Sequence, residues 1–394
     1  MTGTPGRRRT RRTDARLDVE GGVALFAELA SVIYSLTELR NLRSFTLPYP
    51  AISQFAFDRT VLRCLQLGQQ PPRSIAELLE WCRHRSADSP LFGVPSDLVT
   101  PDATLVHPVG LMPTRTCLEV ASYEREDGPE REALALLDEL ATRCGSTDRY
   151  RACRSFLQRH PMVSGGARYE TGWNRNVWTR VKTLYEPVPE SFLAGGYLLR
   201  CPACGLPALL GDRRVPDQGP PFSGDDTWCE GETCRSPQPF EVIHEPEKTW
   251  ILRRSLRTFL ALPHRVEESA LAELDRAGIE CTLLTDDLAA YRLSGAGPGT
   301  RILQFRNRIQ PALLAAGTGR CAESLAADLT VVAVPRRFAE CGQYRAAFFA
   351  ALPRHVVQQV RLTHPHDIAR CVRAPLAGSS PQGPTTGKAD GDDA

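Results

Sequence analysis

The stretch "RILQFRNRIQPALL", residues 301–314, decides how the last third of the chain folds. Its first five residues have the apolar, β-prone composition of a short buried strand, and "IQPALLAAG" after them has the composition of a helix. Four polar residues lie at the junction between the two: Gln304, Arg306, Asn307 and Arg308. The stretch therefore predicts a strand that runs directly into a helix.

Helices and strands also alternate in the sequence on both sides of this stretch. The helix "RVEESALAELDRAG" precedes it and ends at Gly278, with inward positions at Val266, Ala270, Leu271 and Leu274. The strands "IECTLLTDD" and "AAYRLSG" follow, and "TRILQF" is the third. After the second helix come "LTVVAVP", a buried fourth strand, and the helix "QYRAAFFAALP". Residues 248–373 are therefore expected to form an α/β domain.

Residues 18–195 are expected to form a mainly helical domain. "GGVALFAELASVIYSLTELR" places four residues on one helix face, Leu25, Leu29, Val32 and Leu36. Ser74 with Glu77 three residues later is typical of a helix start. "GPEREALALLDELATRCG" has glutamates in its first turn and a helix stop at Gly145.

The end of this helical domain, residues 168–191, combines aromatic and basic residues. One helical face carries Trp173, Val177, Val181 and Leu184, and the cations Arg175, Arg180 and Lys182 point mostly away from it. Such a helix can contact a phosphate backbone or an acidic partner. The alternative is that the aromatic residues belong to the core and the cations are only solvated.

A cysteine cluster follows in residues 196–247. "CPACG" supplies Cys201 and Cys204, and "WCEGETC" supplies Cys229 and Cys234. Four thiolates in tetrahedral geometry select zinc, and they leave no open coordination position, so the sequence predicts a zinc-ribbon-like insert with a structural zinc. His244 in place of Cys234, a catalytic zinc, and no metal at all are the alternatives.

Length and composition exclude several classes of protein. The 394 residues, 42% hydrophobic, suffice for two or three domains, so we expect an α+β multidomain chain. No apolar run approaches the roughly 18 residues of a membrane span, and no apolar segment follows the basic start, so we expect a cytoplasmic protein. Thirteen cysteines then favour free thiols and a metal site over disulfides.

Both ends of the chain are expected to be disordered, because residues 1–17 and 374–394 are low in apolar content. The first segment is a basic arm, and such an arm either lies along nucleic-acid phosphates or is a solvated tail.

The carboxy-terminal pattern resembles a known family. The helix ending in Gly278, the strand pair and the continuation through "QPALLA" to "LTVVAVPRR" resemble the restriction-endonuclease-fold protein that accompanies pPIWI-RE, a prokaryotic PIWI-like family of defence islands, found beside a helicase. The aromatic "RYETGWNRNVWTRVKTLYEPVP" and the cysteine cluster resemble the three-gene-island part that precedes this domain. The resemblance covers most of residues 20–372.

The resemblance implies a role in anti-plasmid or anti-phage defence. The PIWI-like protein would recognise a nucleic-acid target, DNA or an RNA–DNA hybrid, and the endonuclease-fold partner would cut it. Active members of that fold need an acid after the first strand, a second acid on the next strand, and a lysine two residues beyond it. The acids hold magnesium, and the lysine positions or activates the attacking water.

Mapped onto this chain, these positions carry other residue types. The place of the first acid falls near Tyr291 or Arg292, and the places of the second acid and the lysine fall on Gln304 and Arg306. No lysine occurs in residues 249–387, so a shifted alignment does not restore it. Arginine stays protonated near neutral pH and does not replace a proton-transferring lysine. The catalytic centre is therefore expected to be degenerate.

Two pairs of acids survive nearby, Glu267 with Glu268 and Asp286 with Asp287. Two of these carboxylates can bind one magnesium ion, but we expect them in a solvated helix start and a turn. The substituted positions would instead form a cationic pocket that favours phosphate, made of Arg292, Arg306 and Arg308.

Three hypotheses of function follow. The leading one is a nucleic-acid-associated defence component with a degenerate endonuclease-like domain, acting beside a PIWI-like protein and a helicase. The second is an active magnesium-dependent endonuclease that uses the displaced acids. The third is a zinc-containing module that binds or regulates other proteins.

Overall fold

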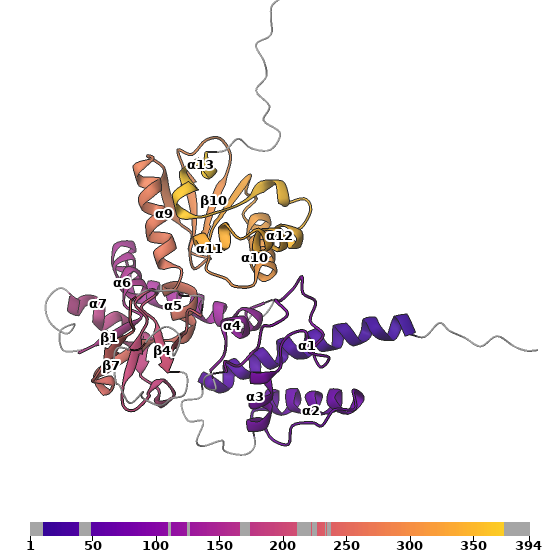
Figure 1. Ribbon diagram of the computed structural model, residues 1–394. Helices are drawn as coiled ribbons and strands as arrows, with labels where there is room; N and C mark the ends of the chain where they lie inside the picture. Colours follow the sequence, from indigo (N-terminus) through magenta and orange to yellow (C-terminus); the bar gives the residue numbers. More distant parts are fainter. Residues whose placement is uncertain are drawn as a thin grey trace, which may run out of the picture.

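The computed structural model describes residues 11–38, 49–108, 112–123, 127–165, 174–210, 222, 227–232, 234 and 238–373. The predicted carboxy-terminal tail, residues 1–10 of the predicted amino-terminal arm and Trp173 lie outside these residues. Residues 11–17, which were expected to be disordered, instead belong to a helix. Three sheets are present in the described part of the chain, together with helices before, between and after them (Figure 1). The expectation of a mixed α and β chain is confirmed.

Helices form the amino-terminal unit. They are α1 (Arg11–Glu38), α2 (Ala51–Gln66), α3 (Ile75–His84), α4 (Arg115–Ala121), α5 (Pro129–Cys144), α6 (Thr147–Arg159) and α7 (Asn174–Val181). The four apolar residues predicted on one face of the first helix are all buried. The Ser74 hydroxyl accepts a hydrogen bond from the Glu77 amide at the start of α3, and α5 ends at Gly145 with a positive φ of 64°. These helix boundaries are therefore confirmed.

A three-stranded antiparallel sheet closes the amino-terminal unit. Its strands are β1 (Met162–Ser164), β2 (Tyr185–Pro187) and β7 (Thr249–Leu252), in the order β1-β7-β2. The short helix α8 (Arg254–Leu256) and the π-helical turn Arg257–Ala261 follow, and Leu252, Leu256 and Leu260 pack in the same core as α1 and α6. Residues from 248 onward were expected in the carboxy-terminal domain, but the pairing of β7 with β1 and β2 places residues 249–261 with the amino-terminal unit.

The cysteine-containing segment forms a small antiparallel sheet. Its strands are β3 (Leu198–Arg200), β4 (Pro207–Leu210), β5 (Thr227–Cys229) and β6 (Glu241–Ile243), in the order β5-β4-β3-β6. Leu198 and Leu209 pack against Met162 and Ile251, so one face of this sheet lies on the three-stranded sheet.

The carboxy-terminal unit is a five-stranded mixed sheet covered on both faces. Its order is β12-β11-β10-β9-β8, and β9 is antiparallel to both of its neighbours while β10, β11 and β12 are parallel. The strands are β8 (Glu280–Leu283), β9 (Ala290–Ser294), β10 (Arg301–Phe305), β11 (Leu329–Ala333) and β12 (Val360–Thr363). The first four are the predicted strands, and β12 is an edge strand that the sequence analysis missed.

The helices α9 (His264–Arg276) and α13 (Ile368–Val372) pack on one face of this sheet, and α10 (Pro311–Ser324) and α12 (Gly342–Ala351) pack on the other (Figure 1). The short helix α11 (Arg336–Ala339) follows β11. Leu303 and Phe305 of β10 face α9, so Gln304 faces the α10 side, because successive side chains of a strand alternate between faces. All five residues of β10 are buried, as a central strand requires.

A buried ion pair joins the amino-terminal and carboxy-terminal units. Arg154 of α6 lies 3.1 Å from Glu267 of α9, and their side chains are 7% and 2% exposed. The Arg154 guanidinium also donates to the carbonyl of Leu288 (2.7 Å), and Tyr291 and Gln158 donate to the Glu267 carboxylate. Glu267 was expected in a solvated helix start, but its side chain is buried and paired. Although burial opposes it, Glu267 raises the pKa of Arg154.

Among the described helices, none combines the length and the apolar character needed to cross a membrane.

The buried pair of Arg154 and Glu267 should contribute to the free energy of unfolding. We expect Arg154→Met to lower the free energy of unfolding by about 3–5 kcal/mol, because it leaves the Glu267 carboxylate buried without a cation. Arg159→Met is the matched control on the same helix. Its pair with Glu268 is 59% exposed on both sides, so its loss should cost less than about 1 kcal/mol. Urea denaturation of both variants measures the difference, and equal losses would contradict the assignment.

Candidate functional site

Four cysteines from two separate loops meet in the small sheet. Cys201 and Cys204 lie between β3 and β4, and Cys229 and Cys234 lie at and after the end of β5. Their Sγ atoms all lie within 4.8 Å of one another, and Cys204 and Cys229 are 4.0 Å apart. Among the described residues, these four form the one cluster of three or more His, Cys, Asp or Glu ligands at such distances.

The sulfur positions fit a tetrahedral zinc ion. A zinc–sulfur distance of about 2.3 Å places neighbouring sulfurs about 3.8 Å apart, close to the separation of Cys204 and Cys229. All four members are soft thiol ligands, and Cys234, not His244, belongs to the cluster. The residues therefore fit a metal such as zinc, in the closed geometry of a structural site.

The backbone of both loops is shaped to bring the thiols together. The Gly205 amide donates to the carbonyl of Cys201 at a φ of 76°, and the Glu232 amide donates to the carbonyl of Cys229 at a φ of 51°. A Cβ atom on Gly231 would lie 2.7 Å from the sulfur of Cys234 and 3.2 Å from that of Cys204. Only glycine leaves room for these two sulfurs at residue 231.

Buried arginines support the second cysteine loop from behind. Arg257 donates two hydrogen bonds to the Glu230 carboxylate, at 2.6 and 2.7 Å, and Arg254 lies 3.4 Å from the same group. Burial opposes ionisation of Glu230, but the Arg257 guanidinium holds its pKa below the usual value. A carboxylate next to Cys229 thus ties the loop to the turn after β7.

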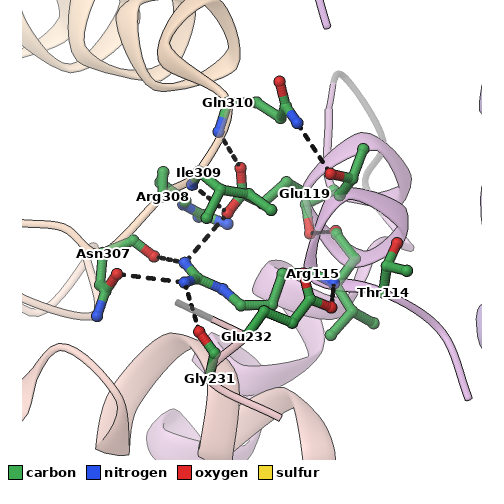
Figure 2. A network of polar contacts seen from close by, with 12 residues as sticks. Thr114, Arg115, Glu119, Gly231, Glu232, Asn307, Arg308, Ile309 and Gln310 are labelled. Carbon is green, nitrogen blue, oxygen red and sulfur yellow. Dashed lines mark hydrogen bonds and ion pairs between the residues drawn. The ribbon is translucent and has the colours of Figure 1, made fainter. Parts of the chain in front are cut away.

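The same loop is bound from the other side by Arg115, the first residue of α4 (Figure 2). Its guanidinium donates to the carbonyl of Gly231 (3.2 Å), and its backbone amide donates to the Glu232 carboxylate (2.6 Å). It also donates to both the side chain and the backbone carbonyl of Asn307. Arg115, 1% exposed, therefore joins the cysteine loop to the junction between β10 and α10.

Glu119, one turn further along α4, holds the start of α10 (Figure 2). Its carboxylate accepts hydrogen bonds from the amides of Ile309 and Gln310, both at 2.9 Å, and pairs with Arg115 at 3.3 Å. Burial raises the pKa of Glu119, and the neighbouring guanidinium opposes this shift. The stretch at 301–314 is thus positioned by a helix that lies about 190 residues earlier in the sequence.

The residues at the expected catalytic positions do not form an acidic site. Tyr291 faces α9 and donates to Glu267, and Arg292 is exposed on β9. Gln304 is 1% exposed, and both polar atoms of its side chain lack a hydrogen-bond partner in the described part of the chain. Arg306 pairs with Asp287, and both side chains are largely buried.

The four acids near the expected catalytic positions differ in burial. Asp286 and Glu268 are exposed, and Asp287 lies in the turn before β9, as expected. Burial opposes ionisation of Asp287, but the Arg306 guanidinium keeps its pKa below the usual value. The Glu267 carboxylate is occupied by Arg154. A guanidinium therefore neutralises each of the two buried acids.

Two of the three arginines expected to form a cationic pocket line one cavity, and each of them is paired with a carboxylate. A cavity of about 500 Å³ lies between α4, α5, α10 and the β8–β9 turn, and it is lined by Arg306 and Arg308. Arg308 pairs with Glu130 at 2.6 Å, as Arg306 pairs with Asp287. Arg292 is not part of its lining.

The three cations predicted on α7 and just after it lie at the surface. Arg175 and Lys182 are exposed and Arg180 is half-buried, whereas Val177, Trp178 and Val181 are buried. The predicted division of this helix into an apolar and a basic face is therefore present in its described residues.

Arg115 and Glu119 were not among the functional residues predicted from the sequence. They lie in "TRTCLEV", where the four-residue spacing of an arginine and a glutamate is typical of a solvated helical ion pair. Their burial depends on residues 307–310 and 231–232, which no local pattern identifies.

One family model matches part of the chain. Residues 25–164 match the pPIWI_RE three-gene island domain Y, which supports an association of this protein with the pPIWI-RE module. The match runs from α1 to β1 and includes Arg115, Glu119 and Arg154. Comparisons with curated proteins and with solved structures give no match.

The cysteine geometry predicts one zinc ion per chain in the purified protein, measured by elemental analysis. Cys229→Ser should reduce the zinc content, because the ion loses one of its four ligands. It should also lower the thermal midpoint of unfolding, because the loop that contacts Arg115 and Arg257 is then no longer fixed by the ion. Cys341→Ser, at an exposed cysteine outside the cluster, is the matched control and should retain one zinc. Zinc well below one per chain in the unmutated protein would refute the site.

Proposed function

We propose that this protein is a non-cleaving, nucleic-acid-associated subunit of the pPIWI-RE defence module. It would act in the cytoplasm beside the PIWI-like protein and the helicase of that module, on DNA or an RNA–DNA hybrid. Zinc would be its structural cofactor, held by the four cysteines. Magnesium would be needed only if cleavage remained. The match of residues 25–164 to a domain of the pPIWI-RE island supports the association.

The order of elements in the carboxy-terminal unit supports a restriction-endonuclease-like fold. The helix α9, the antiparallel strands β8, β9 and β10, the helix α10 and the parallel strand β11 follow one another in the order found in that fold. The central strand β10 begins the parallel part of the sheet. Its end is a place where functional residues of α/β sheets gather.

The observation that carries the proposal is the pairing of the remaining charges near the end of β10. Cleavage of a phosphodiester by this fold needs carboxylates free to hold a metal ion. Here Asp287 is bound by Arg306, and Glu267 is bound by Arg154. An ion pair that is buried and hydrogen-bonded is costly to open, because each charge would be left unpaired. We therefore propose that the domain kept its fold without its cutting chemistry.

The exposed cations of α7 and of the turn directly after it are the proposed contact to nucleic acid. Arg175 and Lys182 are exposed, so they can approach phosphates without opening an internal pair. By contrast, Arg306 and Arg308 are committed to carboxylates. Phosphate contacts of this kind bind nucleic acid without reading its sequence.

A nuclease assay tests the loss of cleavage. The purified protein with magnesium or manganese should leave single-stranded DNA, duplex DNA and RNA–DNA hybrid intact, since the two buried acids are neutralised by arginines. Metal-dependent cutting that disappears in Asp287→Asn, but not in a variant of the exposed neighbour Asp286→Asn, would replace the proposal with an active endonuclease.

A binding titration tests the nucleic-acid contact. We expect Arg175→Ala combined with Lys182→Ala to weaken binding and to reduce the slope of log affinity against log salt by about 2, because two phosphate contacts are lost. Arg370→Ala, at a cation 79% exposed on the carboxy-terminal unit, is the control and should leave the slope unchanged. No affinity for any nucleic acid at low salt, together with stable binding to a protein of the module, would favour a purely protein-binding role.

A further inference from the structure

The cavity of about 500 Å³ between the amino-terminal and carboxy-terminal units has no part in the zinc site or in the contact made by α7. Its size lies in the range of small-ligand pockets, roughly 300–1,000 Å³. One wall comes from the end of α4 and from α5. The other wall comes from the β8–β9 turn, the end of β10 and α10. A ligand in it would touch both units.

The charges that line the cavity separate into paired and unpaired groups. Glu130 and Asp287 are bound by Arg308 and Arg306, and Glu119 is bound by Arg115 and by backbone amides. Three charged groups remain without an opposite charge among the described residues: Arg131, Arg320 and Asp286. The two arginines come from opposite walls, one from α5 and one from α10, and both are exposed at the cavity. The uncommitted charge is therefore mainly cationic.

The remaining lining supplies an aromatic ring and buried polar atoms. The Arg320 guanidinium lies 5.7 Å from the ring centre of Tyr123, so the ring and the cation lie together on the lining. The Thr318 hydroxyl, on a residue 1% exposed, has no hydrogen-bond partner among the described residues. Apolar walls complete the cavity, for example Leu134, Leu288 and Leu314.

Two guanidinium groups without a carboxylate partner and one aromatic ring on the same cavity lining fit one ligand chemistry well. Guanidinium groups bind phosphate oxygens with paired hydrogen bonds, and aromatic rings stack on nucleobases. We propose that this cavity binds one phosphorylated nucleotide, with its phosphate at Arg131 and Arg320 and its base beside Tyr123. The nucleotide is either free or the phosphorylated end of a strand.

If the nucleotide is a strand end, the inference rests on the proposed function and names the part of the nucleic acid that the protein recognises. If the nucleotide is free, the inference stands without nucleic-acid binding. Because the two arginines belong to different units, the bound phosphate would stabilise the junction of the units.

The structure offers two independent ways to disable the cavity. Arg131→Ala combined with Arg320→Ala removes the uncommitted cations. Gly317→Leu fills the space, since Gly317 lines the cavity and a Cβ built on it meets no atom within 4 Å. This position lies inside α10, where leucine is a better helix former than glycine, so the variant should fold. The matched controls are Arg370→Ala and Gly342→Leu, whose added Cβ also meets no atom within 4 Å.

The experiment titrates the full-length, zinc-loaded protein with nucleoside 5′-monophosphates and with one short oligonucleotide. The oligonucleotide carries a 5′-phosphate, a 3′-phosphate or no terminal phosphate. If the strand end is the ligand, one terminal phosphate strengthens binding about tenfold or more, and both cavity variants remove that gain while the controls keep it. If the free nucleotide is the ligand, the monophosphates bind with the same dependence on Arg131, Arg320 and Gly317.

Other outcomes overturn the inference or separate it from the proposed function. Oligonucleotide binding that depends on Arg175 and Lys182 but is indifferent to terminal phosphate and to the cavity variants overturns the inference and leaves the proposed function intact. Monophosphate binding without any oligonucleotide binding supports the inference and refutes the nucleic-acid role. Binding of neither ligand overturns both. Thermal midpoints of the variants close to that of the unmutated protein ensure that lost binding is not lost folding.

Discussion

The position of Arg115 constrains the whole molecule. Its guanidinium is almost completely buried, so its donors need acceptors inside the protein; Nη1 and Nη2 have them, and Nε has none among the described residues. The acceptors come from three places in the chain: α4 itself, the second cysteine loop, and the junction after β10. The helical unit, the small sheet and the α/β unit therefore meet at one cation (Figure 2).

The zinc ligands gain a second role from this arrangement. The loop that carries Cys229 and Cys234 also presents Glu230 to Arg257, and Gly231 and Glu232 to Arg115. A metal that fixes this loop would fix both arginines at the same time. Burial lowers the pKa of Arg337, from the α/β unit, and the nearby cysteine thiols oppose this shift. The small sheet is thus better understood as a joint between units than as an isolated insert.

The same rule, that buried charges must be paired, explains the region around the end of β10. Arg306 and Arg308 would repel each other and anything cationic if they stood alone, but Asp287 and Glu130 neutralise them. Of the arginines that line the cavity, Arg306 and Arg308 are paired with carboxylates. Arg131 and Arg320 are exposed and have no carboxylate partner among the described residues. The arrangement favours binding an anion at the rim over holding a metal ion between carboxylates.

Local patterns in the sequence were enough to predict the helices at α1, α3 and α5, four of the five strands of the α/β unit, and the four cysteines of the cluster. Each of these depends on spacing within a short segment, which apolar periodicity or ligand chemistry reveals. Only the tertiary structure decided that Glu267 is buried, that residues 249–261 join the amino-terminal unit, and that Arg115 and Glu119 hold the junction after β10. Those outcomes depend on partners that lie far apart in the chain, more than 100 residues for Glu267, Arg115 and Glu119, and local spacing carries no signal for such contacts.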